Sequence, residues 1–450
     1  MNIVILGAGS IGSYLASTLS GEGHDVILID REYKALERIG LYSDIAIRMG
    51  SGTDPQLLEE VKEFSPHFFI AVSSEDETNL TACAIAKNLG YPKTIARIRQ
   101  RAFLDNCPLD IQRLFCVDHI LGTERIIAED ILKCILHPGS LAVENFAHGA
   151  VQMRTIVIPE NYPDQGKPLA QVHLNDDLLI GLIRRKITGE SGTIIFPKGQ
   201  DLLLPGDEAT VVGKLDVMED LQGIFGLVKK FVRTAVIIGG SGVAIHLAQR
   251  LLKHKIKVKI IEQDEGKCAQ LAALFPKAII LNHEGTDFAF LKEESVDSAD
   301  IFIACTSSHE TNILAAILGK QAGCCDVIAL VSDESAIPLL QRLDISYSLS
   351  EKGSIARRIQ IILHDETFIS WASLYDNQAR IMEVKISSHS ELIGMPICDL
   401  SSALPKNLLI AMIKNENGII IPKGNHVLNP GDTAIVICGP ESIEEMEKMF

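Results

Sequence analysis

One long segment of this chain is written twice, and this repeat constrains the fold more than any other feature of the sequence. An apolar run ending in a glycine-rich loop opens the first copy at residues 3–12 and the second at residues 236–244. Shorter matches follow in the same order in both copies: Gly52-Thr53-Asp54 and Gly285-Thr286-Asp287, Glu77-Thr78-Asn79 and Glu310-Thr311-Asn312, Pro205-Gly206-Asp207 and Pro430-Gly431-Asp432. A unit of about half the chain is far longer than a solenoid repeat, so the sequence consists of two duplicated halves.

The first part of each half alternates apolar strands with helical patterns. In the first copy we expect strands at 2–6, 25–29, 44–48, 67–72, 94–98 and 118–121, and helices at 10–20, 32–39, 55–64, 76–89 and 124–136. This alternation is typical of βαβ units and a parallel sheet. Strands that are apolar throughout also fit a sheet covered on both faces. The prediction is an α/β fold with one Rossmann-like parallel-sheet domain in each half.

From residue 141 the pattern changes to short β-rich segments joined by turns. Turns are expected at 197–199 and 205–207, because proline presets φ and glycine accepts a positive φ. A helix is expected over 218–225. We therefore divide the chain into a first Rossmann domain, a first small α+β module, a second Rossmann domain and a second module, at residues 1–140, 141–228, 229–368 and 369–450.

The apolar stripe at 124–136, with its equivalent near 355–363, closes each Rossmann unit. A stripe of this kind marks an amphipathic helix. It is equally compatible with a helix in the domain core and with a crossover helix at a seam between domains.

Composition excludes several classes of partner. The net charge of −16 argues against nucleic-acid binding and against a polybasic membrane anchor. No stretch reaches the roughly 18 apolar residues that span a bilayer, and the N-terminus has no signal-peptide pattern. The ten cysteines lack zinc-ligand spacing, so we expect reduced thiols and no metal site. We expect no direct membrane insertion, and any contact with a membrane then runs through another protein.

The first glycine loop, at residues 7–12, has the spacing of a dinucleotide-binding turn. Gly7 permits a tight turn, Gly9 lets the backbone approach a pyrophosphate, and Gly12 lets the helix pack close to the sheet. The pyrophosphate would sit at the helix N-terminus, where free N–H groups favour an anion. Asp30 ends the second strand, where a carboxylate binds ribose hydroxyls and repels a 2′-phosphate. The loop therefore predicts NAD(H) or an adenine nucleotide, and the alternative is a Rossmann fold with an empty site.

The second glycine loop departs from this pattern. Gly239 keeps the first glycine and Glu262 keeps the acid, but Ser241 replaces the middle glycine and Ala244 the last. Alanine is tolerated at the last position, whereas serine in the middle would crowd a pyrophosphate. The second domain is either a weaker nucleotide site or a structural Rossmann domain that lost its ligand.

Further candidates follow the other strands. Asp54 is either a helix N-cap or, with Thr53, a neighbour of the adenine side of a nucleotide. Ser73 and Arg97 stand at the carboxyl ends of strands, where open α/β sheets bind ligands. Glu77 and Asn79 fit the start of a helix better than ligand contacts, yet their repetition at 310 and 312 indicates that something demands these two residues.

No catalytic constellation is visible. The sequence has no Tyr-x-x-x-Lys pair, Gly-x-Ser-x-Gly elbow, His-Glu-x-x-His motif or Walker pattern. We therefore expect a nucleotide sensor and no enzyme. An NAD-dependent oxidoreductase with an unidentified substrate is the rival interpretation, and a purely structural scaffold is the third.

The tandem order of Rossmann unit, crossover helix and small β-rich module, together with the sequences at 71–73, 77–79 and 96–99, resembles the TrkA family of potassium-uptake regulatory proteins. Each half of that family is an RCK unit, a regulator of potassium conductance. The resemblance implies a peripheral cytoplasmic subunit at the inner face of the cell membrane, assembled as a homo-oligomer ring. It also implies that NAD(H), or an adenine nucleotide such as ATP or ADP, gates a separate integral-membrane potassium-translocating subunit.

By the same resemblance, residue positions carry over to both halves. The first-unit nucleotide residues would be Gly7, Gly9, Ser10, Ile11, Gly12, Asp30, Thr53, Asp54, Ser73 and Arg97. The second-unit positions would be Gly239, Ser241, Glu262 and Asp287. Because Ser241 departs from the family pattern, the second site is the weaker prediction, and the second half is expected to serve mainly in assembly.

Overall fold

The structure is a computed structural model that describes most of the chain. The described residues are 1–40, 44–105, 107–172, 174–185, 192–227, 231–332, 334–363, 368–375, 378–390, 392–402, 404–405, 407–416, 418–442, 445–446 and 449–450. The predicted boundary at residue 228 lies outside them. Their contacts divide the chain into two compact units, one of residues 1–132 and 232–359 and one of residues 133–231 and 360–450.

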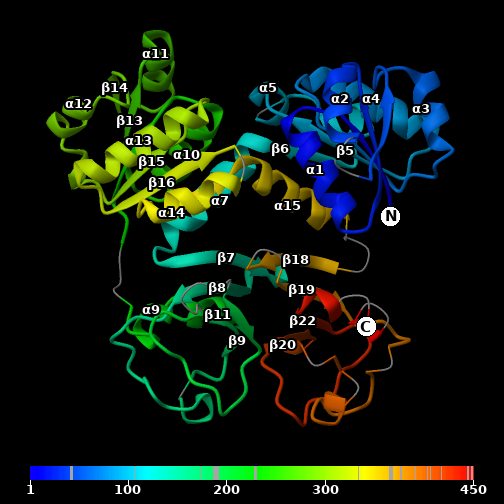
Figure 1. The fold of residues 1–450 in the computed structure, drawn as a ribbon, viewed down its shortest axis with the longest axis vertical. Helices are drawn as coiled ribbons and strands as arrows, with labels where there is room; N and C mark the ends of the chain where they lie inside the picture. Colours follow the sequence, from blue (N-terminus) through cyan, green and yellow to red (C-terminus); the bar gives the residue numbers. More distant parts are fainter. Residues whose placement is uncertain are drawn as a thin grey trace. The chain divides into compact units, whose positions relative to one another are not determined.

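The first Rossmann domain contains a six-stranded parallel sheet in the order β3-β2-β1-β4-β5-β6 (Figure 1). Its strands are β1 (Asn2–Leu6), β2 (Asp25–Asp30), β3 (Ala46–Met49), β4 (Phe68–Ala71), β5 (Lys93–Ile98) and β6 (His119–Gly122). Its helices are α1 (Ser10–Gly21), α2 (Tyr33–Gly40), α3 (Pro55–Lys62), α4 (Asp76–Leu89), α5 (Arg101–Leu104), α6 (Ile111–Leu114) and α7 (Thr123–Leu136). This strand order is that of a doubly wound nucleotide-binding fold, which confirms the predicted fold class.

The second Rossmann domain repeats the topology in the order β14-β13-β12-β15-β16-β17. Its strands are β12 (Thr234–Ile238), β13 (Lys257–Glu262), β14 (Ile279–Asn282), β15 (Ile301–Ala304), β16 (Asp326–Val331) and β17 (Tyr347–Ser350). Its helices are α10 (Gly242–Lys253), α11 (Glu265–Leu274), α12 (Phe288–Glu293), α13 (His309–Ala322), α14 (Ile337–Arg342) and α15 (Glu351–Leu363). In both domains the central strands are almost fully buried, as continuous apolar strands require.

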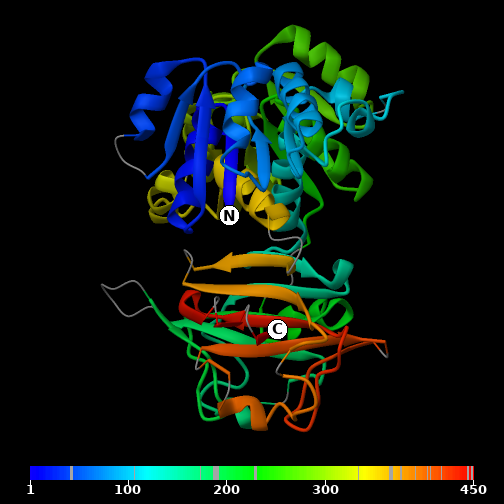
Figure 2. The ribbon, with the colours of Figure 1, turned by 90° about the vertical axis from the view of Figure 1, so that its right-hand side faces the viewer.

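Each module is built on a five-stranded antiparallel sheet, and strands of both modules appear in the lower part of Figure 2. The first sheet has the order β10-β9-β11-β8-β7, with β7 (Ser140–Phe146), β8 (Val151–Val157), β9 (Leu178–Arg185), β10 (Thr193–Ile195) and β11 (Glu208–Lys214). The second has the order β18-β19-β22-β20-β21, with β18 (Phe368–Leu374), β19 (Ala379–Lys385), β20 (Leu408–Asn415), β21 (Gly418–Ile420) and β22 (Thr433–Cys438). One apolar cluster contains buried side chains of both modules, such as Met153 and Ile437.

One local prediction in the first module was wrong. The single helix expected over 218–225 is two short helices, α8 (Leu215–Met218) and α9 (Leu221–Ile224), with a break at Glu219 and Asp220. The segment is too short for its periodicity to determine one regular helix.

Helix α7 combines the two roles that its sequence left open. Ile127 and Ile131 are 1% and 0% exposed, so one face belongs to the core. On another face, the Glu129 carboxylate accepts a hydrogen bond of 3.0 Å from Arg250 on α10, in the second Rossmann domain. The helix therefore joins the two Rossmann domains of one compact unit. Among the described residues, no helix has the length and apolarity that crossing a bilayer requires.

Candidate functional site

The loop between β1 and α1 requires glycine at two positions. Gly7 has φ +105°, and a Cβ atom there would lie 2.8 Å from the amide nitrogen of Ser73. A Cβ atom on Gly12 would overlap the carbonyl oxygen of Gly7. The chain turn and the close approach of α1 to the sheet therefore depend on these two residues, as the sequence predicts.

The N-terminus of α1 is open. Its N-cap residue is Gly9, no side chain caps the helix, and the first turn carries no acidic residue. A Cβ atom on Gly9 would meet nothing within 4 Å. The first hydrogen bond to the cap runs from the Ser13 amide to the Gly9 carbonyl at 2.9 Å, which leaves the amides of Ser10, Ile11 and Gly12 as the free donors of the helix end. An uncapped helix N-terminus with free space beside it is suited to a phosphate group.

Asp30 stands beside this helix end. One carboxylate oxygen accepts a hydrogen bond from the Ala8 amide at 2.6 Å, and the other accepts one from the Glu32 amide at 2.9 Å. The side chain is only half-buried. Because each carboxylate oxygen has a second lone pair, Asp30 retains acceptors for ribose hydroxyls while the loop holds its orientation.

The carboxyl ends of β4 and β5 are tied together by Asn79, which is fully buried. Its Oδ1 accepts hydrogen bonds from the amide and hydroxyl of Ser73 at 2.9 and 2.7 Å, and its Nδ2 donates to the carbonyl oxygen of Arg97 at 2.9 Å. In the second half, Asn312 accepts from the amide and hydroxyl of Thr306 at 2.7 and 2.8 Å. This brace is the structural demand that the repeated asparagine indicated, and it engages the Ser73 hydroxyl.

Asn79→Ala is expected to lower the free energy of unfolding by about 3 kcal/mol, because it leaves buried backbone groups of both strands without partners. The measurement is thermal or urea unfolding of the full chain. The control is Asn88→Ala on the same helix, since Asn88 is exposed and, among the residues that the structure describes, its side chain bonds only the Ala84 carbonyl of its own helix. Equal stability of the two variants would contradict the bracing role.

Arg97 brings positive charge to the same edge of the sheet. The residue is 9% exposed, and its Nη1 donates a long hydrogen bond of 3.4 Å to the Ser73 carbonyl. Its Nε has no hydrogen-bond partner among the described residues. Burial and the nearby Arg99 lower the pKa of this guanidinium. A buried cation with an unused donor is the kind of group that an anionic ligand would satisfy.

Two further predicted residues lie after β3. Asp54 is the N-cap of α3 and accepts a hydrogen bond of 3.0 Å from the Gln56 amide. The Thr53 hydroxyl lies 2.9 Å from that of Ser51. The capping interpretation of Asp54 is therefore confirmed. A contact of Thr53 or Asp54 with the adenine side of a nucleotide stays a prediction.

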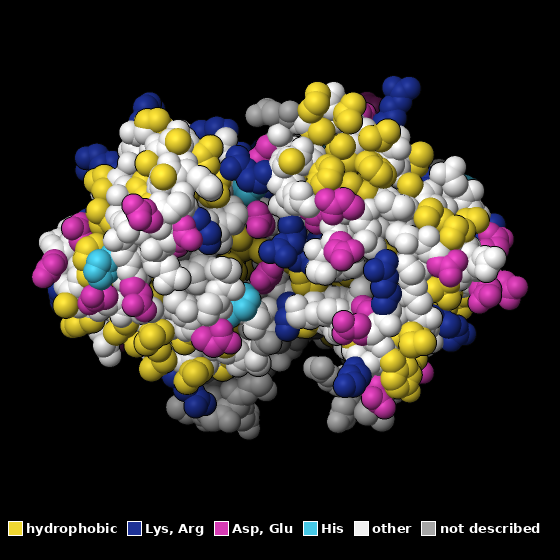
Figure 3. All heavy atoms as spheres, turned by 90° about the horizontal axis from the view of Figure 1, so that it is seen from above, with side chains coloured by type: hydrophobic (Ala, Val, Ile, Leu, Met, Phe, Trp, Pro, Cys, Tyr) yellow, Lys and Arg dark blue, Asp and Glu magenta, His cyan; other side chains and the backbone are white. Residues whose placement is uncertain are grey.

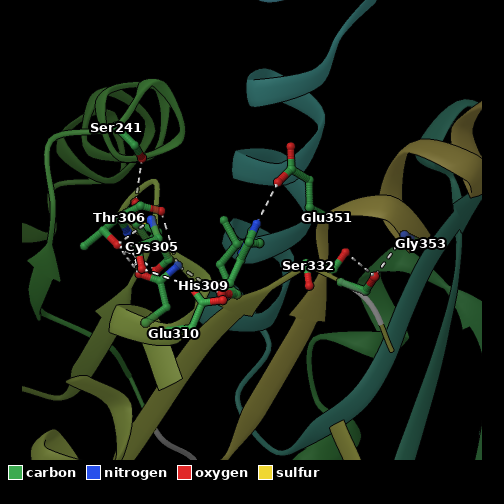
Figure 4. Close-up of polar contacts among 12 residues, drawn as sticks. Ser241, Cys305, Thr306, His309, Glu310, Ser332, Glu351 and Gly353 are labelled. Atoms are coloured by element: carbon green, nitrogen blue, oxygen red, sulfur yellow. Dashed lines mark hydrogen bonds and ion pairs between the residues drawn. The ribbon is translucent and has the colours of Figure 1, made fainter. Parts of the chain in front are cut away.

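The second glycine loop is arranged differently, as the close-up in Figure 4 shows. Ser241 is the N-cap of α10, and its hydroxyl accepts a hydrogen bond from the Ala244 amide at 3.3 Å and donates to the Cys305 carbonyl at 2.5 Å. Glu262 is buried and accepts bonds from the Gly240 amide at 2.5 Å and from the Asp264 amide. The helix end that is open in the first half is therefore closed by a side chain in the second.

Two other residues at this edge also bond within the chain. Asp287 caps α12 by accepting from the Ala289 and Phe290 amides. His309, at the start of α13, points toward Glu351, with 3.5 Å between Nε2 and Oε2 (Figure 4). Gly239 keeps the turn with φ +99°. Sequence reasoning missed His309 and Glu351, because only the packing of the domain brings the two helix starts together.

Comparison with known proteins agrees with this architecture. The TrkA-N domain family matches residues 3–116 and 235–351, and the TrkA-C domain family matches residues 153–226 and 381–450. The chain is 30% identical over 459 aligned positions to the Trk system potassium uptake protein TrkA homolog 1 of Methanosarcina mazei, with 100% of both chains covered. It is 27% identical to the Trk system potassium uptake protein TrkA of Haemophilus influenzae, with 100% of this chain and 98% of that one covered.

Solved structures share the fold at lower sequence identity. The GsuK RCK domain superposes with a TM-score of 0.62 at 16% identity, covering 100% of this chain and 94% of that one. The GsuK channel bound to NAD gives a TM-score of 0.63 at 16% identity, covering 100% of this chain and 78% of that one. Both domain families match both halves of the chain, and the relatives matched over their full length are TrkA proteins. The chain therefore belongs to the TrkA family of Trk system potassium uptake proteins.

Proposed function

We propose that the chain is a nucleotide-binding regulatory subunit of a Trk-type potassium uptake system. The observation that carries this proposal is the uncapped N-terminus of α1, with free space beside Gly9 and with Asp30 next to the loop. A helix end of this kind binds phosphate, and a carboxylate at the end of β2 binds ribose. The names of the relatives, which are potassium uptake proteins, support the physiological assignment.

The preferred ligand is NAD(H), with ATP or ADP as further adenine nucleotides. Its phosphates would lie on the amides of Ser10, Ile11 and Gly12, and its ribose on Asp30. The Arg97 guanidinium, with its unused Nε, would supply positive charge at the neighbouring strand end. The Asp30 carboxylate would repel the 2′-phosphate of NADP. One solved structure of the same fold is the GsuK channel bound to NAD, which supports the ligand class.

The regulated pore would be a separate integral-membrane potassium-translocating protein. The chain would bind it from the cytoplasmic side as a ring of identical copies. A ligand shifts such an assembly only by its different affinities for two conformations. The Glu129–Arg250 ion pair between α7 and α10 is a route by which a change in the first Rossmann domain would reach the second. We propose no catalytic role, and the domain limits at 140, 228 and 368 stay predictions.

An apolar pocket and exposed apolar side chains on the first Rossmann domain support self-association. An apolar pocket is lined by residues of α4 and by the end of α6, including Ile85, Leu89 and Phe115. Leu109 and Leu114 nearby are 58% and 57% exposed. Hydrophobic side chains gather on this domain in the view from above (Figure 3). A second copy of the chain is the occupant that the ring requires, and exposed apolar patches are typical of such contacts.

Asp30→Ala is expected to weaken binding of NADH, NAD⁺, ATP and ADP by about tenfold or more, because each ligand loses its ribose acceptor. Isothermal titration of the purified full chain measures the affinity, and light scattering of the same samples reads the mass of the ring. The control is Asp25→Ala, since Asp25 lies at the opposite end of β2 and is exposed.

Two results would count against the proposal. Absence of saturable binding of all four nucleotides by the unmodified chain would overturn the sensor function. Unchanged affinity of Asp30→Ala would remove Asp30 from the site. Substrate-dependent formation of NADH in a metabolite screen would instead favour an oxidoreductase.

A further inference from the structure

A carboxyl group from the first half of the chain lies against the N-terminus of α10. Glu124 lies in the first turn of α7, and Gly242 is the first residue of α10. A Cβ atom built on Gly242 would overlap the carboxyl group of Glu124, with both oxygens and Cδ as its nearest neighbours. The carboxylate therefore lies directly against the beginning of α10.

This contact explains a difference between the two glycine loops. Gly242 occupies the position that Ser10 holds in the first loop, immediately after the N-cap residue. A side chain at 242 would displace Glu124, so glycine is required there by the contact between the two Rossmann domains. In the first loop the corresponding serine is exposed, and the space beside the preceding Gly9 is free.

The surroundings of Glu124 combine influences of both signs. The side chain is half-buried, and burial is the main influence that raises the pKa of its carboxyl group. Arg99 and Arg101 act in the opposite direction, while Glu351 and Asp76 add negative charge nearby. The two arginines and the positive end of α10 therefore offset part of the cost of burying this carboxylate.

We propose that Glu124 is a specificity-determining residue that occupies the phosphate position of the second Rossmann domain and excludes nucleotides from it. A nucleotide phosphate entering there would meet a carboxylate in contact, so the two negative charges would repel each other. Exclusion by a repulsive group is as effective a source of specificity as added attraction. The inference rests on the proposed function and extends it, because it confines nucleotide binding to the first half of the chain. The contact between Glu124 and the start of α10 does not depend on that function.

The test measures how many nucleotides each chain binds, with ADP and NADH as probes. The unmodified chain is expected to bind one per chain. Because the Ser241 hydroxyl caps α10, the Glu124 variants are made in a Ser241→Gly background. In that background Glu124→Ala is expected to add a second binding event, about tenfold or more tighter than any second binding by Ser241→Gly alone. Glu124→Gln removes the charge but keeps the size of the side chain. It is expected to add the same binding event, at lower affinity than Glu124→Ala.

Two combined variants identify where the added nucleotide binds, and a third variant is the control. Glu262→Gln, combined with Glu124→Ala, should abolish the second event, because Glu262 is the acid of the second loop. Asp30→Ala in the same combination should weaken the first event about tenfold or more and leave the second unchanged. Glu129→Gln is the matched control, since it removes a carboxylate from the same helix, where it pairs with Arg250.

The results separate this inference from the proposed function. One nucleotide per chain in the unmodified protein and in both Glu124 variants would overturn the inference and leave the sensor function standing. No binding by the unmodified chain, but one Glu262-dependent nucleotide in Glu124→Ala, would overturn the sensor function and support the inference. A second binding event in Glu129→Gln, as tight as that in Glu124→Ala, would also overturn the inference about Glu124. General loosening of the contact between the Rossmann domains would then explain the gain.

Discussion

Gly9→Ser is expected to weaken nucleotide binding by about 100-fold while the chain stays folded. Gly9 has φ −67° and ψ −175°, which any residue adopts, and its Cβ position is free of neighbours. A serine hydroxyl would cap α1 as the Ser241 hydroxyl caps α10, and it would stand where the phosphate has to approach. Ser and Gly at an N-cap differ by only a few tenths of a kcal/mol in stability, so the loss is specific to the ligand.

Titration with NADH and ADP measures the effect, and a thermal melt checks the fold. The control is Gly21→Ser at the other end of α1, where an added Cβ also meets nothing within 4 Å. That variant should bind like the unmodified chain. Full affinity in Gly9→Ser would mean that the phosphates do not lie at the N-terminus of α1.

Gly12→Ala is expected to destabilise the first Rossmann domain by about 3 kcal/mol, because its methyl group meets backbone that cannot move aside. The new Cβ would overlap the Gly7 carbonyl oxygen and lie 3.3 Å from Cγ2 of Val72. The equivalent residue of the second half is Ala244, which is fully buried and native there. The cost therefore comes from the closer approach of α1 to its sheet, and nucleotide binding should fall with it.

The midpoint of thermal unfolding of the full chain measures the loss. Gly9→Ala is the matched control, because it adds the same methyl group three residues earlier into free space. It should unfold at nearly the temperature of the unmodified chain. Equal midpoints for the two variants would show that α1 retreats from the loop at little cost.

Much of the fold was predictable because its signals are local. Continuous apolar strands, helical stripes and glycines at fixed positions depend only on near neighbours in the chain. They predicted a parallel sheet in each half and, in the first half, strands that overlap all six observed ones. Short elements escaped: α5 and α6 have four residues each, too few for a periodic pattern. The segment 218–225 broke into α8 and α9 because contacts with the module, and not helix propensity, determine its course.

The site divides in the same way. The sequence alone determined the tandem architecture, the glycine loop of the first half, the acid at Asp30 and the weaker pattern at Ser241. Each of these features is recognised from residue types and their spacing along the chain. Only the tertiary structure decided why Asn79 is repeated and which anion faces α10. Those answers depend on residues far apart in sequence. Asn79 bonds the carbonyl oxygen of Arg97, 18 residues further along the chain, and Glu124 reaches a helix of the other Rossmann domain. Contacts of this kind follow from the packing of whole domains, which no local pattern encodes.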